Sequence, residues 1–170
     1  MVLNRIYQLG KLYLDLDISE KENELGCAEA VNFLFKRATG EEIGGNVSTY
    51  KMYLVLKGND KFRQVSEPKE GDIIISPTGY GVGNGHVGVV SDNNKIMSNN
   101  SFTKKWDEHL TLETWKIRYS AFPIEFYRHK FAELDDIEKL KEENLNLMKE
   151  NKEYKEANAS ILKWIAFYFK

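Results

Sequence analysis

The sequence of 170 residues contains a single cysteine, Cys27. One thiol excludes an internal disulfide framework and a cysteine-based zinc site, since each needs more than one cysteine. What remains is either a thiol that is buried for structural reasons or one that reacts. The surroundings of Cys27 in the sequence therefore carry much of the functional information.

The chain also lacks an excess of charge of one sign, because its formal net charge is −2 at pH 7. Such a balance gives no electrostatic reason to expect a nucleic-acid partner, and it provides no broad basic surface for anionic lipid. With 42% hydrophobic and 29% charged residues, the composition is typical of a soluble globular protein. At this length we expect one domain followed by an appendage.

Long apolar runs are missing as well, and no stretch approaches the roughly 18 residues that a membrane-spanning helix requires. Residues 1–14 are amphipathic and include Arg5 and Lys11, without the apolar core or the small-residue cleavage site of a signal peptide. We therefore expect a protein that is made in the cytoplasm without a signal peptide. It would reach any target outside the cell by another route.

Hydrophobic spacing predicts helices first and strands later. Helical periodicity covers residues 2–14, 26–36, 48–57 and 111–119, and the second helix is expected to end near Gly40 or at the Gly44-Gly45 pair. Extended runs at 62–65, 72–76, 86–90, 95–100 and 124–128 predict strands, with a hairpin turn at 92–94. Helices followed by an antiparallel meander indicate an α+β fold.

The composition changes at residue 131, and a heptad pattern runs through residues 137–168. Its a positions include Asn144, Asn151 and Asn158, and asparagine there fixes the register and favours a two-stranded coiled coil. The alternative is a single solvated helix. We therefore expect a domain at 1–130 and, at 131–170, a C-terminal coiled-coil helix that forms a homo-oligomer. Its apolar end, 161–169, would seal the oligomer or touch a membrane surface.

An acidic loop follows the first helix and contains the Asp-x-Asp-x-Ser spacing of Asp15, Asp17 and Ser19. Glu20 stands where an EF-hand needs glycine, and Gly26 stands where it needs a bidentate glutamate, so this loop is not an EF-hand. A solvated loop is the favoured interpretation. A less regular calcium site around Asp15 and Asp17 is the alternative, and no other cofactor is expected.

Two residues have the surroundings of a thiol nucleophile and its base. Cys27 is expected in the first turn of a helix, where unpaired amides and the helix dipole favour the thiolate and lower its pKa from about 8.5 toward neutrality. His86 begins a predicted strand after the glycine-rich run 79–85, which lets backbone approach a substrate. The alternative is a buried thiol and a satisfied histidine. The pattern favours a Cys–His dyad.

A Cys–His dyad usually includes a third group that orients the imidazole, and we expect it on the strand after His86. Asn100 is favoured because its amide oxygen can accept a hydrogen bond from the ring N–H. Ser98 lies on the same face and is the second choice, whereas Asn99 points to the other face.

The oxyanion hole would use the backbone N–H of Cys27 and one more donor that the sequence does not identify, with Tyr80 and Asn84 as suggestions. The other histidines, His109 and His129, flank charged segments that are typical of a surface. No catalytic role is expected for either of them.

Three segments together resemble a known superfamily. They are Gly26-Cys27-Ala28-Glu29-Ala30-Val31, Glu70-Gly71-Asp72-Ile73-Ile74-Ile75 and Gly85-His86-Val87-Gly88-Val89-Val90. As a set they resemble the papain-like cell-wall amidases and endopeptidases of the CHAP and NlpC type, and the segments after residue 95 are similar to small phage-associated members. The resemblance covers residues 20–130. It implies a papain-like cysteine peptidase fold, with N-terminal helices packed on an antiparallel sheet.

The function implied by this resemblance is hydrolysis of an amide bond in peptidoglycan through a thioester acyl-enzyme. Cys27 would be the nucleophile, His86 the general base, and Asn100 or Ser98 the orienting residue. Release by lysis, or transport on a virion, would bring such an enzyme to its substrate. Two alternatives stay open: a non-catalytic binding or assembly module of the same fold, and a Cys–His amidase or acyltransferase for a small intracellular substrate.

Overall fold

The structure is a computed structural model that describes residues 4–19, 26–45, 47–79 and 84–130. The chain divides into two units, Met1–Asp135 and Asp136–Lys170, and all of the described residues belong to the first. The coiled coil and homo-oligomer predicted at 137–168, and the apolar residues 161–169, lie outside the described residues. None of the helices within the described ranges is long and apolar enough to cross a membrane.

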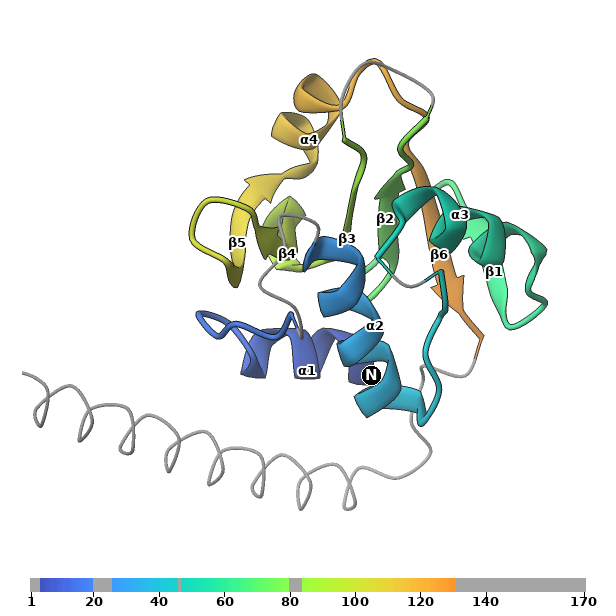
Figure 1. Ribbon diagram of the computed structural model, residues 1–170, viewed down its shortest axis with the longest axis horizontal. Helices are drawn as coiled ribbons and strands as arrows, with labels where there is room; N and C mark the ends of the chain where they lie inside the picture. Colours follow the sequence, from blue (N-terminus) through green and yellow to red (C-terminus); the bar gives the residue numbers. More distant parts are fainter. Residues whose placement is uncertain (1–3, 20–25, 46, 80–83, 131–170) are drawn as a thin grey trace, which may run out of the picture. The chain divides into compact units, whose positions relative to one another are not determined.

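Helices come first and strands follow, and the fold class is α+β, as predicted (Figure 1). The predicted helix and strand ranges agree with the structure to within a few residues, except that α1 is shorter than expected and β5 has no predicted counterpart. In chain order the elements are α1 Arg5–Leu12, α2 Gly26–Thr39, α3 Thr49–Gly58, β1 Phe62–Val65, β2 Ile73–Ser76, β3 His86–Val90, the short 3-10 helix η1 Asp92–Asn94, β4 Lys95–Asn100, β5 Lys105–Thr111, α4 Leu112–Arg118 and β6 Glu125–His129.

Local sequence explains where these helices begin and end. The Ser48 hydroxyl accepts a hydrogen bond from the Lys51 amide and caps α3. Thr111 and Thr114 form a reciprocal capping box at the start of α4. After α2, Gly40 has a φ of +83°, a left-handed conformation that glycine adopts without steric cost and that stops the helix.

The six strands of the described residues form one antiparallel sheet in the order β1-β6-β2-β3-β4-β5. Strands β2, β3 and β4 follow the predicted meander and β5 extends it, but β6 does not continue it. Instead β6 is inserted between β1 and β2, where Tyr127 pairs with Gln64 on one side and with Ile73 on the other. The prediction of a simple meander is wrong for this last strand, because hydrophobic patterns identify strands without showing which of them pair.

Strand β5 is the element that the hydrophobic pattern does not reveal. Only Trp106 and Leu110 of its 7 residues are buried, and its register against β4 shifts between Ile96 and Ser98. It lies at the edge of the sheet, where charged side chains discourage pairing with another chain. Its polar composition therefore suits its position, although it hides the strand from a hydrophobicity pattern.

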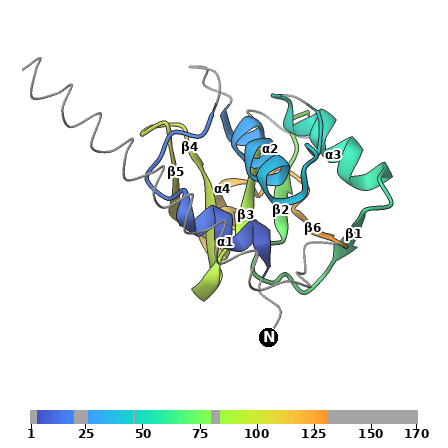
Figure 2. The ribbon, with the colours of Figure 1, turned by 90° about the horizontal axis from the view of Figure 1, so that it is seen from below.

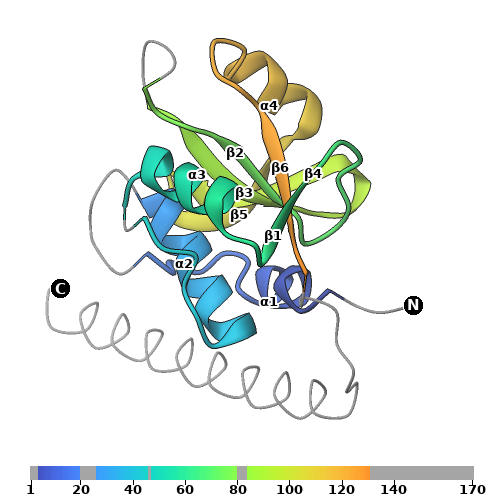
Figure 3. The ribbon, with the colours of Figure 1, turned by 90° about the vertical axis from the view of Figure 1, so that its right-hand side faces the viewer.

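The sheet has α1 and α2 on one face and α4 on the other (Figures 2 and 3). Met97 of β4 faces α1, because a Cβ added to Gly10 would lie 2.7 Å from the Met97 Cε atom. Val89 pairs with Met97 and shares this face. Because side chains alternate along a strand, His86, which is three residues before Val89, points to the α4 face.

The Asp72 carboxylate joins β2 to β6. It accepts hydrogen bonds of 2.8 and 2.6 Å from the guanidinium of Arg128 and one of 2.7 Å from the amide of Lys69. Asp72 is fully buried. The aspartate of the Glu-Gly-Asp segment thus has a structural role, because it holds the inserted strand in place.

Candidate active site

Cys27 lies in the first turn of α2, as predicted, and α2 packs against β3. The backbone N–H groups of Val87, Ala28 and Cys27 itself act on the sulfur and favour the thiolate. Burial has a larger, opposite effect: it raises the pKa of the Cys27 thiol to about 11, because only 8% of the residue is exposed. The prediction of a pKa near neutrality is therefore wrong, since desolvation outweighs the helix start.

His86 is the first residue of β3, and its ring packs against two aromatic rings of the α4 face. The centroid of the His86 ring lies 5.5 Å from that of Tyr119, and the two rings are nearly parallel, with an angle of 17° between their planes. The centroid of the Trp115 ring lies 5.1 Å from that of His86. The pKa of His86 is lowered to about 3, mainly by burial and to a smaller extent by the neighbouring His109 and Arg118. The imidazole is therefore neutral at pH 7.

Cys27 and His86 reach one pocket from two sides of the sheet. We call this cavity of about 330 Å³ the thiol pocket; it is lined by Cys27, Asn84, Gly85, His86, Asn99, Ser101, His109, Arg118, Tyr119 and Phe122. Among the described residues, no hydrogen bond joins the Cys27 and His86 side chains, and Nε2 of His86 has no hydrogen-bond partner. The structure brings the two predicted residues into one cavity without pairing them.

Asn100 and Ser98, the residues predicted to orient the imidazole, are not among those that line the thiol pocket. The Asn100 amide donates a hydrogen bond of 3.0 Å to Asp107, and its oxygen accepts one of 3.0 Å from the Phe102 amide. Ser98 is fully buried, and its hydroxyl has no hydrogen-bond partner among the described residues. Neither side chain is hydrogen-bonded to His86.

Asn99 enters the thiol pocket instead, from the opposite face of β4. It is 3% exposed, and its Oδ1 atom has no hydrogen-bond partner within the described ranges. It packs against the start of α2, because a Cβ added to Gly26 would collide with the Asn99 Nδ2 atom. The residue before Cys27 is therefore a glycine for a steric reason. The side-chain carbonyl of Asn99 is buried at the pocket without a hydrogen-bond partner among the described residues.

His109, for which the sequence predicts no catalytic role, lines the thiol pocket. Its Nδ1 atom contacts the Oδ1 atom of Asp107, and its backbone N–H donates a hydrogen bond of 3.2 Å to the same oxygen. The His109 ring lies 6.5 Å from the ring of His86 and at 67° to it. The Asp-x-His spacing of β5 is the signal for this pair, but it is visible only once residues 105–111 are known to form a strand.

The thiol pocket has a positive electrostatic character. Arg118 is the one residue with a permanent formal charge among its described lining residues, which include no carboxylate. The Arg118 guanidinium lies 5.8 Å from the centre of the Tyr119 ring. Of the two residues suggested as oxyanion donors, Asn84 lines the pocket and Tyr80 lies outside the described residues. An anionic group would find a cation here without a competing acid.

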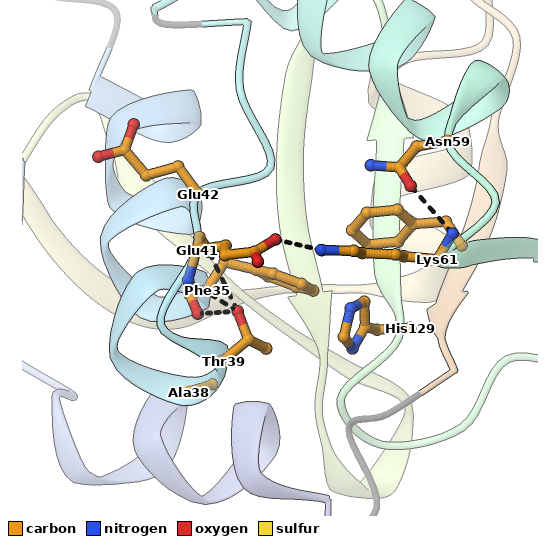
Figure 4. A pocket seen from close by; sticks show the side chains of 9 residues that line it. Phe35, Ala38, Thr39, Glu41, Glu42, Asn59, Lys61 and His129 are labelled. Atoms are coloured by element: carbon orange, nitrogen blue, oxygen red, sulfur yellow. Dashed lines mark hydrogen bonds and ion pairs between the residues drawn. The ribbon is translucent and has the colours of Figure 1, made fainter.

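A second cavity of about 280 Å³, the His129 pocket, lies between α2 and the β1 end of the sheet. It is lined by Phe35, Ala38, Thr39, Glu41, Glu42, Asn59, Lys61, Phe62 and His129 (Figure 4). Glu41 and Lys61 point toward one another and form an ion pair. His129 packs against Phe35 and Phe62 at 5.3 and 5.1 Å and is 8% exposed, so its predicted surface position is wrong.

The acidic loop uses one of its carboxylates locally. Asp17 Oδ1 accepts hydrogen bonds from the amide and the hydroxyl of Ser19, at 3.0 and 2.7 Å. Within the described ranges, no three His, Cys, Asp or Glu side chains form a group that could hold a metal ion. Residues 20–25 of the loop lie outside those ranges, so the calcium alternative at Asp15 and Asp17 stays a prediction.

Comparison with known proteins leaves the assignment to the geometry of the site: no protein-family model matches the chain, and no curated protein matches it either. The chemistry of the thiol pocket is therefore the basis for a functional proposal.

Proposed function

We propose that this chain is a papain-like cysteine hydrolase that cleaves an amide or peptide bond of bacterial peptidoglycan, with Cys27 as the nucleophile. The observation that carries the proposal is that the single thiol of the chain and a histidine line the same pocket. His86 is the base that the sequence predicts. A thiol and an imidazole that share a cleft are the minimum equipment for acyl transfer through a thioester.

The position of Cys27 supports this chemistry. The Cys27 sulfur would attack the carbonyl carbon of the substrate, and the oxygen would become an oxyanion before the amine leaves with a proton. The backbone N–H groups of Val87, Ala28 and Cys27 all act on the sulfur. Donors gathered at that point are suited to stabilise negative charge that develops on or next to the sulfur.

The lining of the pocket supports a substrate that carries a carboxylate. Arg118 provides a cation, while Tyr119 and Phe122 provide apolar surface for the rest of the ligand. Peptides of the bacterial cell wall carry free carboxylates beside their amide bonds. The same proposal includes assembly through residues 137–168, contact of the apolar C-terminal end with a membrane surface, and release by lysis or on a virion.

A second candidate function is a non-catalytic module of the same fold that binds cell-wall peptides in the thiol pocket. Burial, which raises the pKa of Cys27 to about 11, favours this candidate because it disfavours the reactive thiolate. The unpaired polar atoms of His86 and Asn99 are then hydrogen-bonding groups for a ligand that is held but not cleaved.

Zymography on purified bacterial cell walls separates these functions. The wild type is compared with Cys27→Ser, which retains nearly the same volume, and with His129→Gln, a buried histidine of the other pocket, as the matched control. We expect the wild type and His129→Gln to clear the walls, and Cys27→Ser to lose at least about a thousandfold in rate.

Co-sedimentation with the same cell walls completes the test. Clearing that survives Cys27→Ser would overturn the thiol mechanism. A wild type that binds the walls and does not clear them would favour the binding module. A wild type that does neither, while its thiol still reacts rapidly with iodoacetamide, would favour an amidase or acyltransferase with a small substrate.

A further inference from the structure

The thiol pocket contains two histidines that differ in what surrounds their ring nitrogens. In His109, Nδ1 contacts the carboxylate of Asp107. In His86, Nε2 is buried and has no hydrogen-bond partner among the described residues. A base that takes a proton becomes a cation with two N–H groups, and each of these needs an acceptor. The two rings are therefore not equivalent as bases.

The contacts of His109 fix the proton on one nitrogen of its ring and leave the other nitrogen available as a base. The contact with Asp107 fixes Nδ1–H as the donor, so Nε2 of the neutral ring carries the lone pair. The other carboxylate oxygen of Asp107 accepts a hydrogen bond of 3.0 Å from the Asn100 amide. Asn100, Asp107 and His109 thus form a connected series that ends in an imidazole lining the pocket. The side chain of His109 is 21% exposed, so a proton can also exchange with solvent.

His86 has the opposite arrangement. Its ring is stacked on Tyr119 and lies against Trp115, and the Trp115 indole N–H is already donated to Ser76 at 3.0 Å. A proton on the buried Nε2 would have no acceptor among the described residues. The surroundings of His86 therefore suit a neutral ring that forms the wall of the pocket.

Resting on the proposed hydrolase function, we propose that His109, oriented by Asp107, is the proton acceptor for the Cys27 thiol. Nε2 of His109 takes the S–H proton as the sulfur forms a bond to the carbonyl carbon. The imidazolium then gives this proton to the amine nitrogen as the C–N bond breaks, which leaves a thioester. A water molecule attacks the thioester and gives one proton to His109. The acid is released, and the returning proton restores the thiol.

This assignment gives Asn100 a role that differs from the predicted one. Its side chain is hydrogen-bonded to Asp107 and not to His86, so it acts through Asp107 and is a positioning residue. Asp107 is likewise a positioning residue, since it touches the base and not the reacting atoms. Catalysis then depends on β5, the edge strand, because Asp107 and His109 both belong to it.

The test uses the fact that the chain has one cysteine, so iodoacetamide reports on Cys27 alone. The second-order rate of alkylation is measured from pH 5 to 10 for the wild type, His109→Gln, Asp107→Asn, His86→Gln and the control His129→Gln. We expect His109→Gln to lower the rate at pH 7.5 at least about tenfold more than His86→Gln does.

Asp107→Asn is expected to give an intermediate rate and to change the shape of the pH profile, which a purely structural role would not do. His129→Gln is expected to match the wild type. Alkylation in urea gives the rate of the unfolded thiol and is expected to be equal for all variants. If His86→Gln fails to fold, His109→Gln and Asp107→Asn still decide the question. Equal rates for wild type and His109→Gln, or a larger loss in His86→Gln, would overturn the proposal.

Failure of the base assignment and failure of the proposed function are distinguishable. If cell-wall clearing needs Cys27 and His86 but survives His109→Gln, the hydrolase stands and the assignment of His109 falls. If alkylation depends on His109 while no cell wall is cleared or bound, the base assignment stands and the substrate class falls. Alkylation that depends on neither histidine would leave Cys27 a structural thiol and would overturn both.

Discussion

The thiol pocket and the His129 pocket each contain a buried histidine, aromatic rings and one cation, but among the described residues a carboxylate lines only the His129 pocket and pairs with its cation. In the His129 pocket, Glu41 pairs with Lys61, and the Thr39 hydroxyl donates a hydrogen bond of 2.8 Å to the Phe35 carbonyl. In the thiol pocket, polar atoms of His86 and Asn99 have no partner within the described ranges. An unsatisfied buried group costs about 1–3 kcal/mol, so such groups are expected where a ligand completes them.

The largest difference between the two pockets is expected in the free energy of unfolding when a glycine near each pocket is replaced by alanine. A Cβ on Gly85, which lines the thiol pocket, would collide with backbone atoms of Ser76 and Thr78. Gly40, after α2, has open space but a φ of +83°. We expect Gly85→Ala to lower the free energy of unfolding by about 3 kcal/mol, and Gly40→Ala by about 1 kcal/mol. Urea denaturation measures both; equal losses would contradict the tight packing of the backbone around Gly85.

A smaller effect is expected from pH. Burial lowers the pKa of His86 to about 3, below the value of about 6.5 in an unfolded chain. On acidification the unfolded chain therefore binds a proton that the folded chain does not, and stability falls as the pH drops below 6.5. From pH 7 to pH 5 this amounts to about 2 kcal/mol.

The variants His86→Gln and His129→Gln sharpen this comparison, since other titrating groups cancel in the difference from wild type. His86→Gln is expected to remove most of the loss of stability between pH 7 and 5, as measured by urea denaturation at each pH. The pKa of His129 is also lowered by burial and Lys61, but Glu41 opposes the shift, so His129→Gln is expected to remove less. A larger change in His129→Gln would contradict the difference between the two pockets.

The smallest effect is expected from the cations. In the thiol pocket, Arg118 is expected to bind a carboxylate of the substrate, whereas Lys61 is already paired with Glu41. Arg118→Gln should raise KM for cell-wall peptides about tenfold with little change in kcat, as expected when a hydrogen bond to a charged group is lost. Lys61→Gln serves as the control. An unchanged KM in Arg118→Gln would show that the substrate carries no anion at this point.

Several features of the molecule follow from its sequence. The period of apolar residues predicts where α2 and β3 begin. Cys27 and His86 lie at these two positions, and both line the thiol pocket. Asp72 belongs to the same recognisable pattern, although its function is to bind Arg128. Local patterns therefore locate the elements that border the site, because each depends on residues that are neighbours in the chain.

Other features depend on tertiary contacts that no local pattern contains. Burial against β3 raises the pKa of the Cys27 thiol, whereas the start of the helix would lower it. His109 is exposed, as its polar segment indicates, but its contact with Asp107 and its place in the thiol pocket depend on the pairing of β5 with β4. Asn100 lies on the predicted strand, but its side chain donates a hydrogen bond to Asp107 of the neighbouring strand β5. Register and burial decide these outcomes, and both are set by the whole sheet.

The insertion of β6 between β1 and β2 has a consequence for synthesis on the ribosome. Residues 62–65 have their sheet neighbour only once residues 125–129 have emerged, so a nascent chain that stops before them has an incomplete sheet. Pairing over such a long sequence separation is slow compared with local folding. A partly made copy therefore leaves the Asp72–Arg128 pair unformed, and the sheet of the described residues is completed only when β6 has been synthesised.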